Sequence, residues 1–253
     1  MQLTLVHLYP DLMNVYGDRG NVLALQRRCA WRGIELRVES VGIGDPLRPE
    51  VCDLVFFGGG QDREQEVVSP DFVEHKGSAI RDAVEAGAVV LAVCGGYQLL
   101  GHSYTTVDGE ELAGVGVFDV RSPPGSRRHI GNIVVRAELD GMAQTLVGFE
   151  NHSGRTYLGP GCRPLGRVLI GSGNNGEDGT EGAVYREAHG CYMHGSLLPK
   201  NPWFADHLIG RALRRRYGPE AVLTPLDDTL EARAHEAVVG RARRLGAVRS
   251  GAW

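Results

Sequence analysis

The chain has 253 residues, of which 42% are hydrophobic and 23% are charged, and its formal net charge is −4. This length suits one α/β domain with an appendage or two small domains, and the acidic balance does not favour a nucleic-acid partner. The N-terminus lacks a basic region followed by a long apolar core, and no apolar run approaches the ~18 residues of a membrane span. We therefore expect neither a signal peptide nor a transmembrane segment.

The five cysteines are spread along the chain without any CxxC pair. This spacing predicts neither a disulfide framework nor a zinc site, so we expect no metal in this chain. Scattered free thiols are typical of a reducing compartment, and we expect a cytoplasmic protein.

The first half of the chain alternates strand and helix patterns. Short apolar runs predict strands over residues 3–8, 34–41, 53–57 and 88–93, and helical periodicity covers residues 21–32 and 69–87. This alternation predicts an α/β fold with a mainly parallel central sheet and helices on both faces. Functional groups in such sheets gather at the carboxyl ends of the strands.

The second half changes character. Residues 114–193 show short strands broken by Gly-, Asn- and Pro-rich turns, which predict an antiparallel or mixed extension of the sheet with long loops around the site. Helical patterns return over residues 204–217 and 230–245. We therefore predict a main domain over residues 1–200 and a C-terminal helical extension over residues 201–253. The arginine run at 214–216 favours a solvated helix face, with a partner-docking patch as the alternative.

The segment AVVLAVCGGYQ at 88–98 is the most informative stretch. A buried strand is followed at once by Cys94, two glycines and a helix-compatible segment, which is the layout of a nucleophile elbow. A sulfur held at a helix N-terminus is favoured as the thiolate. The alternative is a small buried residue that caps a core strand.

A thiolate that attacks an amide carbon needs oxyanion donors and a base. Gly95 can supply one backbone N–H, and the loop Gly58–Gly60 at the neighbouring strand end can supply the other, although triple glycine also occurs in phosphate-binding or tight turns. Among nine histidines, His194 follows an apolar strand and is favoured over His189, which begins the same strand. The base is therefore expected at the carboxyl edge that carries Cys94.

Three stretches, GGG at 58–60, CGGYQ at 94–98 and YMHG at 192–195, resemble the class I (triad-type) glutamine amidotransferases, in the branch shared with cobyric acid synthases. Further stretches are similar to the glutaminase subunits of lipid II isoglutaminyl synthases: LYPDLMNVYGDRGN (8–21), GGGQDREQ (58–65), GFENHSGRTYLG (148–159), GNNGEDGTEG (173–182) and HGSLLPKNP (194–202). The likeness runs nearly end to end and implies the class I glutamine amidotransferase fold.

The resemblance implies catalytic roles for two side chains, with Cys94 as nucleophile and His194 as general base and acid. It also implies that the N–H groups of Gly60 and Gly95 form the oxyanion hole and that Gln98 lies near the bound substrate.

The resemblance further implies that Arg128 grips L-glutamine, and a guanidinium fork can indeed hold an α-carboxylate with two hydrogen bonds. Its neighbour Arg127 is the competing candidate, and an exposed loop arginine is the alternative reading.

A third catalytic group is not evident. The wider class places a carboxylate two residues after its histidine, where this chain has Ser196. Glu150 or another distant acid, a Cys–His dyad, or a carboxylate from a partner subunit could each account for this departure.

The resemblance also implies a partner. Without a P-loop, the chain has no means of activating a carboxylate with ATP, so a Mur-ligase-like synthetase would bind ATP and Mg, form a heterodimer with this chain and reach lipid II. No cofactor is expected in the chain itself. The D-glutamate of lipid II would become D-isoglutamine in peptidoglycan synthesis, at the inner face of the membrane.

Three other functions stay open on the sequence. The chain could supply ammonia for another acceptor such as a cobyrinic-acid-like macrocycle, although such enzymes usually carry a fused ATP-dependent domain. It could be a Cys-dependent peptidase or deglycase of related fold, which usually has His directly after the Cys. It could also be a non-enzymatic regulatory subunit.

Overall fold

The structure is a computed structural model that describes residues 1–250. A six-stranded central sheet has the order β13-β14-β4-β3-β1-β2. Its strands are β1 (Gln2–Leu8), β2 (Glu35–Val41), β3 (Leu54–Phe57), β4 (Val89–Val93), β13 (Ala183–Tyr185) and β14 (Ala188–Cys191). Every neighbouring pair is parallel except β13 and β14. The predicted parallel sheet is confirmed.

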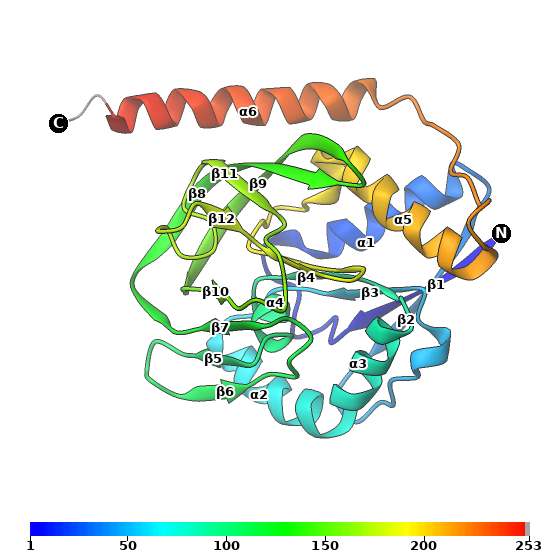
Figure 1. The fold of residues 1–253 in the computed structure, drawn as a ribbon, viewed down its shortest axis with the longest axis horizontal. Helices are drawn as coiled ribbons and strands as arrows, with labels where there is room; N and C mark the ends of the chain where they lie inside the picture. Colours follow the sequence, from blue (N-terminus) through cyan, green and yellow to red (C-terminus); the bar gives the residue numbers. More distant parts are fainter. Residues whose placement is uncertain (251–253) are drawn as a thin grey trace.

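Helices cover both faces of this sheet, as Figure 1 shows. They are α1 (Arg19–Ala30) and α5 (Pro202–Tyr217) on one face, and α2 (Asp62–Asp71) and α3 (Gly77–Glu85) on the other. All residues of β3 and β4 are buried, which is why both strands read as unbroken apolar runs. Short helical turns complete this half: η1 (Val15–Gly17), η2 (Pro49–Val51), η3 (Phe72–Lys76) and α4 (Gly95–Leu99).

The helical stretch predicted over 69–87 begins earlier than expected. Its first helix, α2, starts at Asp62, because Gln61 and Glu64 form a capping box at its N-terminus. The first turns of α2 are polar and show little apolar periodicity, so the sequence pattern concealed them. A π-helical turn, η3, joins α2 to α3 just after Pro70.

The second half builds two further sheets. One has the order β12-β11-β8-β9 and consists of β8 (Pro124–Leu139), β9 (Met142–Gly154), β11 (Gly166–Ile170) and β12 (Thr180–Glu181). The other has the order β10-β7-β5-β6, with β5 (Ser103–Thr105), β6 (Glu111–Ala113), β7 (Val120–Ser122) and β10 (Tyr157–Leu158). Only β13 and β14 join the central sheet, so the prediction of short strands extending that sheet was wrong for most of this region.

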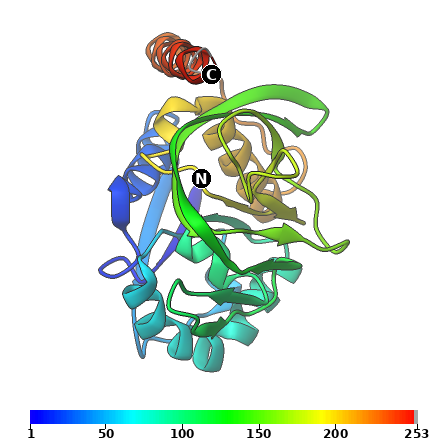
Figure 2. The same ribbon diagram turned by 90° about the vertical axis from the view of Figure 1, so that its left-hand side faces the viewer.

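The long β8–β9 hairpin follows from its turn. Leu139 pairs with Met142 across a two-residue loop, in which Asp140 and Gly141 both have positive φ, of 52° and 73°. That turn matches the twist of the flanking strands and keeps them paired over many residues. The hairpin curves over the carboxyl edge of the central sheet (Figure 2).

The two C-terminal helices differ in packing. α5 belongs to the main core, where Phe204, Leu208 and Leu213 are fully buried. By contrast, α6 (Thr229–Ser250) lies across the outside of the sheet that contains β8 and β9. Its Ala242 packs against Val134 and Val147 of these strands (Figure 1). The division at residue 200 remains a prediction about organisation, but packing places α5 with the sheet and leaves α6 as the extension. No helix within residues 1–250 is long and apolar enough to cross a membrane.

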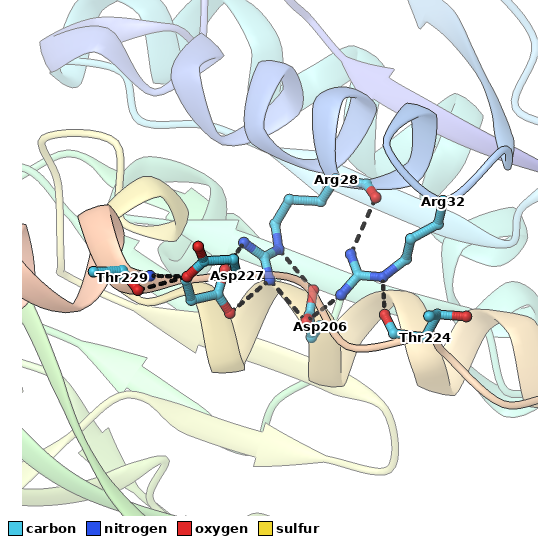
Figure 3. A network of polar contacts seen from close by, with 7 residues as sticks. Arg28, Arg32, Asp206, Thr224, Asp227 and Thr229 are labelled. Carbon is cyan, nitrogen blue, oxygen red and sulfur yellow. Dashed lines mark hydrogen bonds and ion pairs between the residues drawn. The ribbon is translucent and has the colours of Figure 1, made fainter.

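Buried ion pairs hold the C-terminal segment to the core (Figure 3). Arg28 of α1 binds both Asp206 of α5 and Asp228, with N–O distances of 2.6 and 2.7 Å. Arg32 binds Asp206 and donates to the Thr224 carbonyl oxygen, at 2.5 Å in each case. A buried guanidinium is stable only when paired in this way, so α1, α5 and the segment before α6 form one unit.

The predicted arginine face is partly exposed to solvent, but it also makes contacts within the chain. Arg216 binds the buried carboxylate of Asp53 at 2.7 Å, and Arg215 donates to the Ala86 carbonyl oxygen at 3.0 Å. The arginine run therefore fastens the end of α5 to the central sheet, and two of its three side chains are engaged within the chain.

Candidate functional site

Cys94 lies directly after β4 and caps the N-terminus of α4. Its backbone has φ 50° and ψ −105°, a conformation that costs a non-glycine residue about 1–3 kcal/mol. The Cys94 N–H donates to the Cys191 carbonyl oxygen at 2.8 Å, which ties this turn to β14. The predicted strand–turn–helix is therefore present with Cys94 at the turn, and Cys94 is 7% exposed.

The glycines beside Cys94 allow two loops to touch through their backbones. A Cβ on Gly95 would lie 3.0 Å from the Gly60 nitrogen, and one on Gly96 would lie 2.5 Å from the Phe57 carbonyl oxygen. The Gly96 N–H donates to the Gly58 carbonyl oxygen at 3.1 Å. Gly60 and Gly95 are thus neighbours next to Cys94, as the sequence predicted.

The triple glycine is needed because its neighbours fill the space around it. A Cβ on Gly58 would lie 2.2 Å from the Met13 carbonyl oxygen, and one on Gly60 would lie 2.4 Å from the Met13 sulfur. A Cβ on Gly59 would lie 2.8 Å from Cε1 of His194. The three glycines therefore leave room for Met13 and His194. Close packing explains this glycine-rich loop, and no phosphate-binding role is needed to explain it.

His194 follows β14, which is parallel to β4, so both residues stand at the same edge of the sheet. Its backbone exchanges two hydrogen bonds with Phe149 of β9, at 2.9 and 3.2 Å. The side chain is fully buried, and the neighbouring Cys94 is one of the groups that raise its pKa. His189 instead packs against Phe204, and burial lowers its pKa to about 3. The structure therefore brings His194, and not His189, to the cysteine.

The carboxylate beside His194 belongs to Asp18, to which the sequence analysis gave no role. Asp18 Oδ1 lies 3.4 Å from His194 Nδ1, and Oδ2 accepts the Gly59 N–H at 2.8 Å. Asp18 is fully buried at the start of α1. The oxygens of Glu150 accept the N–H groups of Ser172 and Gly173 instead, so the distant acid that contacts His194 is Asp18 and not Glu150. The carboxylate that contacts His194 therefore comes from this chain itself.

One signal could have found Asp18. It lies within the stretch 8–21 that carries the family likeness, and that stretch follows β1 at the same carboxyl edge as Cys94 and His194. Ser196, which occupies the expected carboxylate position, donates to the Gly17 carbonyl oxygen at 2.7 Å. It therefore fixes the loop that precedes Asp18.

The electrostatics of this group favour a charged histidine. Burial lowers the pKa of His194, but the neighbouring Cys94 and Asp18 outweigh it and raise the pKa above its ordinary value. An imidazolium between a thiolate and a carboxylate is the charge arrangement that activates cysteine as a nucleophile.

A cavity of about 180 Å³ opens beside Cys94 and is lined by residues of α2, α4, β8 and β9. Pockets for drug-sized ligands measure roughly 300–1,000 Å³, so this cavity suits a smaller molecule such as an amino acid. Four predicted site residues line it: Gly60, Cys94, Gln98 and Arg128. A larger cavity of about 440 Å³, beside His102 and Asp119, contains none of them. No cluster of metal-binding side chains was found in residues 1–250.

Gln98 forms part of the cavity wall and is 3% exposed. Its Nε2 donates to the Tyr192 hydroxyl at 3.0 Å, and that hydroxyl pairs with Thr156 Oγ1 at 2.7 Å. His152, which the sequence analysis did not select, also lines the cavity and stacks on Tyr192 with ring centroids 3.7 Å apart. Burial lowers the pKa of His152 to about 3, so this ring is neutral.

Arg128 stands at the exposed rim on a bulge of β8. Between Pro124 and His129 the strand register shifts against β9, and the residues in this interval are pushed out of the ladder. Arg128 Nε donates to Asn151 Oδ1 at 2.7 Å, which directs the guanidinium. Arg127 does not line the cavity, and its carbonyl oxygen accepts a hydrogen bond from Arg155 at 2.5 Å. Of the two candidate arginines, Arg128 is therefore the one that lines the cavity.

The sequence and fold match known proteins. The CobB/CobQ-like glutamine amidotransferase domain matches residues 4–202. The GatD subunit of lipid II isoglutaminyl synthase (glutamine-hydrolyzing) from Staphylococcus aureus strain N315 is 39% identical, covering 96% of this chain and 97% of that protein. Its counterpart from Streptococcus pneumoniae strain R6 is 40% identical over 90% of this chain and 87% of that protein.

More distant matches agree. A cobyric acid synthase from Pelotomaculum thermopropionicum is 32% identical over 72% of this chain, which corresponds to 36% of that protein. A glutamine amidotransferase structure from Thermotoga maritima superposes with a TM-score of 0.54 at 17% identity, over 94% of both chains. The latter supports the fold alone. The chain belongs to the CobB/CobQ-like glutamine amidotransferase family and, within it, groups with the GatD subunits.

Proposed function

We propose that this chain is a glutaminase subunit that hydrolyses L-glutamine and passes ammonia to a Mur-ligase-like synthetase. The observation that carries this proposal is the convergence of Cys94, His194 and Asp18 beside a small cavity lined by Arg128. The near full-length likeness to GatD supports the same reading.

The first half of the reaction forms a thioester. The Cys94 thiolate attacks the carboxamide carbon of glutamine, and the N–H groups of Gly60 and Gly95 stabilise the oxyanion. His194 donates its proton to the departing nitrogen, the C–N bond breaks, and ammonia leaves a γ-glutamyl thioester on Cys94.

The second half releases glutamate. His194, now neutral, removes a proton from water as the water attacks the thioester carbon, and the C–S bond breaks to restore the thiolate and the imidazolium. Asp18 holds the Nδ1 side of the ring throughout, so the proton moves only at the side that faces Cys94. Arg128 binds the α-carboxylate, and Gln98 supports the wall beside the reacting amide.

Ammonia then needs an activated acceptor. We expect the partner subunit to bind ATP and Mg, to activate the α-carboxylate of D-glutamate in lipid II, and to form D-isoglutamine at the cytoplasmic face of the membrane. A cobyrinic-acid-like acceptor is less well supported, because this chain corresponds to little more than a third of the cobyric acid synthase that it resembles.

Ammonia release from glutamine by the purified chain tests the proposal. Because Asp18 gives the chain its own carboxylate, we expect release by the chain alone and its loss in Cys94→Ala. A strict requirement for the synthetase would mean that a partner group completes the site. Transfer of amide ¹⁵N from glutamine to lipid II by the complex tests the acceptor, and labelled ammonia without labelled lipid II would reject it.

A further inference from the structure

The cavity beside Cys94 has an uneven set of charged groups. Three charged side chains line it: Asp62, Arg63 and Arg128. Asp62 is therefore the single carboxylate among its lining residues. It is the first residue of α2 and half-buried, whereas both arginines are exposed at the rim.

Asp62 differs from other shielded aspartates in its partners. Asp53, Asp71 and Asp206 each bind a lysine or arginine. In residues 1–250, by contrast, no ion pair includes Asp62. Its Oδ1 accepts the Tyr104 hydroxyl at 2.7 Å, and Oδ2 accepts the Val107 N–H at 3.5 Å. The carboxylate is thus held in place by neutral donors, and no described side chain of opposite charge forms an ion pair with it.

A free amino acid carries an α-ammonium group and an α-carboxylate group. A binding site that recognises both groups by their charge needs one anionic and one cationic side chain. The rim supplies the cation as Arg128, and Asp62 supplies the anion in the same cavity. Hydrogen bonds between charged groups are directional and strong enough to discriminate ligands that lack one of the charges.

We propose that Asp62 is the residue that binds the α-ammonium group of L-glutamine while Arg128 binds its α-carboxylate. This inference rests on the proposed glutaminase function. It makes Asp62 a specificity residue that selects free α-amino acids over other primary amides. The competing explanation is purely structural, in which Asp62 only stabilises the N-terminus of α2 and holds Tyr104.

Two glutamine analogues separate these explanations. One is 4-carbamoylbutanoate, which lacks the α-ammonium group, and the other is 4-aminobutanamide, which lacks the α-carboxylate. Each is measured with the full-length chain as a substrate by ammonia release and as a competitive inhibitor of L-glutamine hydrolysis. In Asp62→Asn we expect the apparent affinity for L-glutamine and 4-aminobutanamide to fall about 10–100-fold through KM or Ki, with kcat for L-glutamine little changed. The affinity for 4-carbamoylbutanoate should not fall.

The matched control is Glu64→Gln, which removes a carboxylate from the same turn of α2. Glu64 accepts the Gln61 N–H in the capping box and does not line the cavity, so this variant should keep the wild-type preference. Asp62→Glu retains the charge and should recover part of the discrimination. Tyr104→Phe removes the hydroxyl tie and should also retain the discrimination, because the carboxylate remains.

Each outcome decides the matter. Equal losses of affinity for all three compounds in Asp62→Asn, or the same pattern in Glu64→Gln, would overturn the role of Asp62 and leave the glutaminase function intact. Failure of the wild-type chain and its complex to release ammonia from L-glutamine would instead overturn the proposed function. If Asp62→Asn does not fold, the wild-type chain decides: equal affinity for L-glutamine and 4-carbamoylbutanoate would overturn the proposal, and weaker affinity for 4-carbamoylbutanoate would support it.

Discussion

The proposed reacting groups and the proposed substrate-binding groups lie on different kinds of structure. Cys94, His194 and Asp18 follow parallel strands of the central sheet, and all three are buried. Arg128 stands on a bulged antiparallel hairpin, and Asp62 begins a surface helix. The buried residues of the first region are held rigidly by the central sheet. The second region places two charged side chains at the mouth of the cavity. Variants in the two regions should therefore fail differently, in kcat for the first and in KM for the second.

The largest effect is expected from Cys94→Ala. Loss of the nucleophile should lower glutaminase activity by at least ~10⁴-fold, because no other group can form the thioester. The thermal unfolding midpoint should change little, since the replacement removes one buried sulfur. Residual activity near the wild-type level would place the reaction elsewhere in the molecule.

Asp18→Asn should reduce kcat by about 10²–10⁴-fold with KM nearly unchanged, because the histidine loses the carboxylate that orients its ring. Steady-state ammonia release gives both constants. Asp11→Asn, an exposed change in the same loop, is the control. Similar losses in the two variants would show that the loop, and not the carboxylate, matters.

Arg128→Ala should raise KM for glutamine by about 10–100-fold and leave kcat within a few-fold, as expected when a charged contact to the substrate is removed. Alkylation of Cys94 by iodoacetamide, which has no α-carboxylate, should proceed at the wild-type rate. Arg127→Ala is the matched control. A larger effect from Arg127→Ala would exchange the roles of the two arginines.

The smallest effect concerns pH. The neighbouring Cys94 and Asp18 raise the pKa of His194, so the imidazolium persists above the pH at which a free histidine loses its proton. In a plot of kcat/KM against pH, the decline on the alkaline side should therefore occur above the ordinary pKa of histidine. Asp18→Asn removes one of the raising charges and should move that decline to lower pH by about one unit. A decline that stays in place would mean that Asp18 does not control the proton of His194.

The sequence allowed the central sheet and the meeting of Cys94 and His194 at its carboxyl edge to be predicted, because both residues follow apolar runs of neighbouring parallel strands. Asp18 was missed, since 176 positions separate it from His194 and only the fold joins them. The start of α2 was missed because its first turns are polar. The β8–β9 hairpin alternates buried and exposed residues over a length that looked like several short strands.

The ion pairs of α1 have a consequence for how the protein is made. Arg28 pairs with Asp206, 178 positions later, and Asp18 meets His194 over a similar span. During synthesis the N-terminal part emerges first, so α1 can bury Arg28 only after α5 has left the ribosome. Cys94 is encoded in the first hundred residues, yet His194 and Asp18 come together only near the end of translation. An incomplete chain therefore carries Cys94 without the histidine and carboxylate that are proposed to act with it.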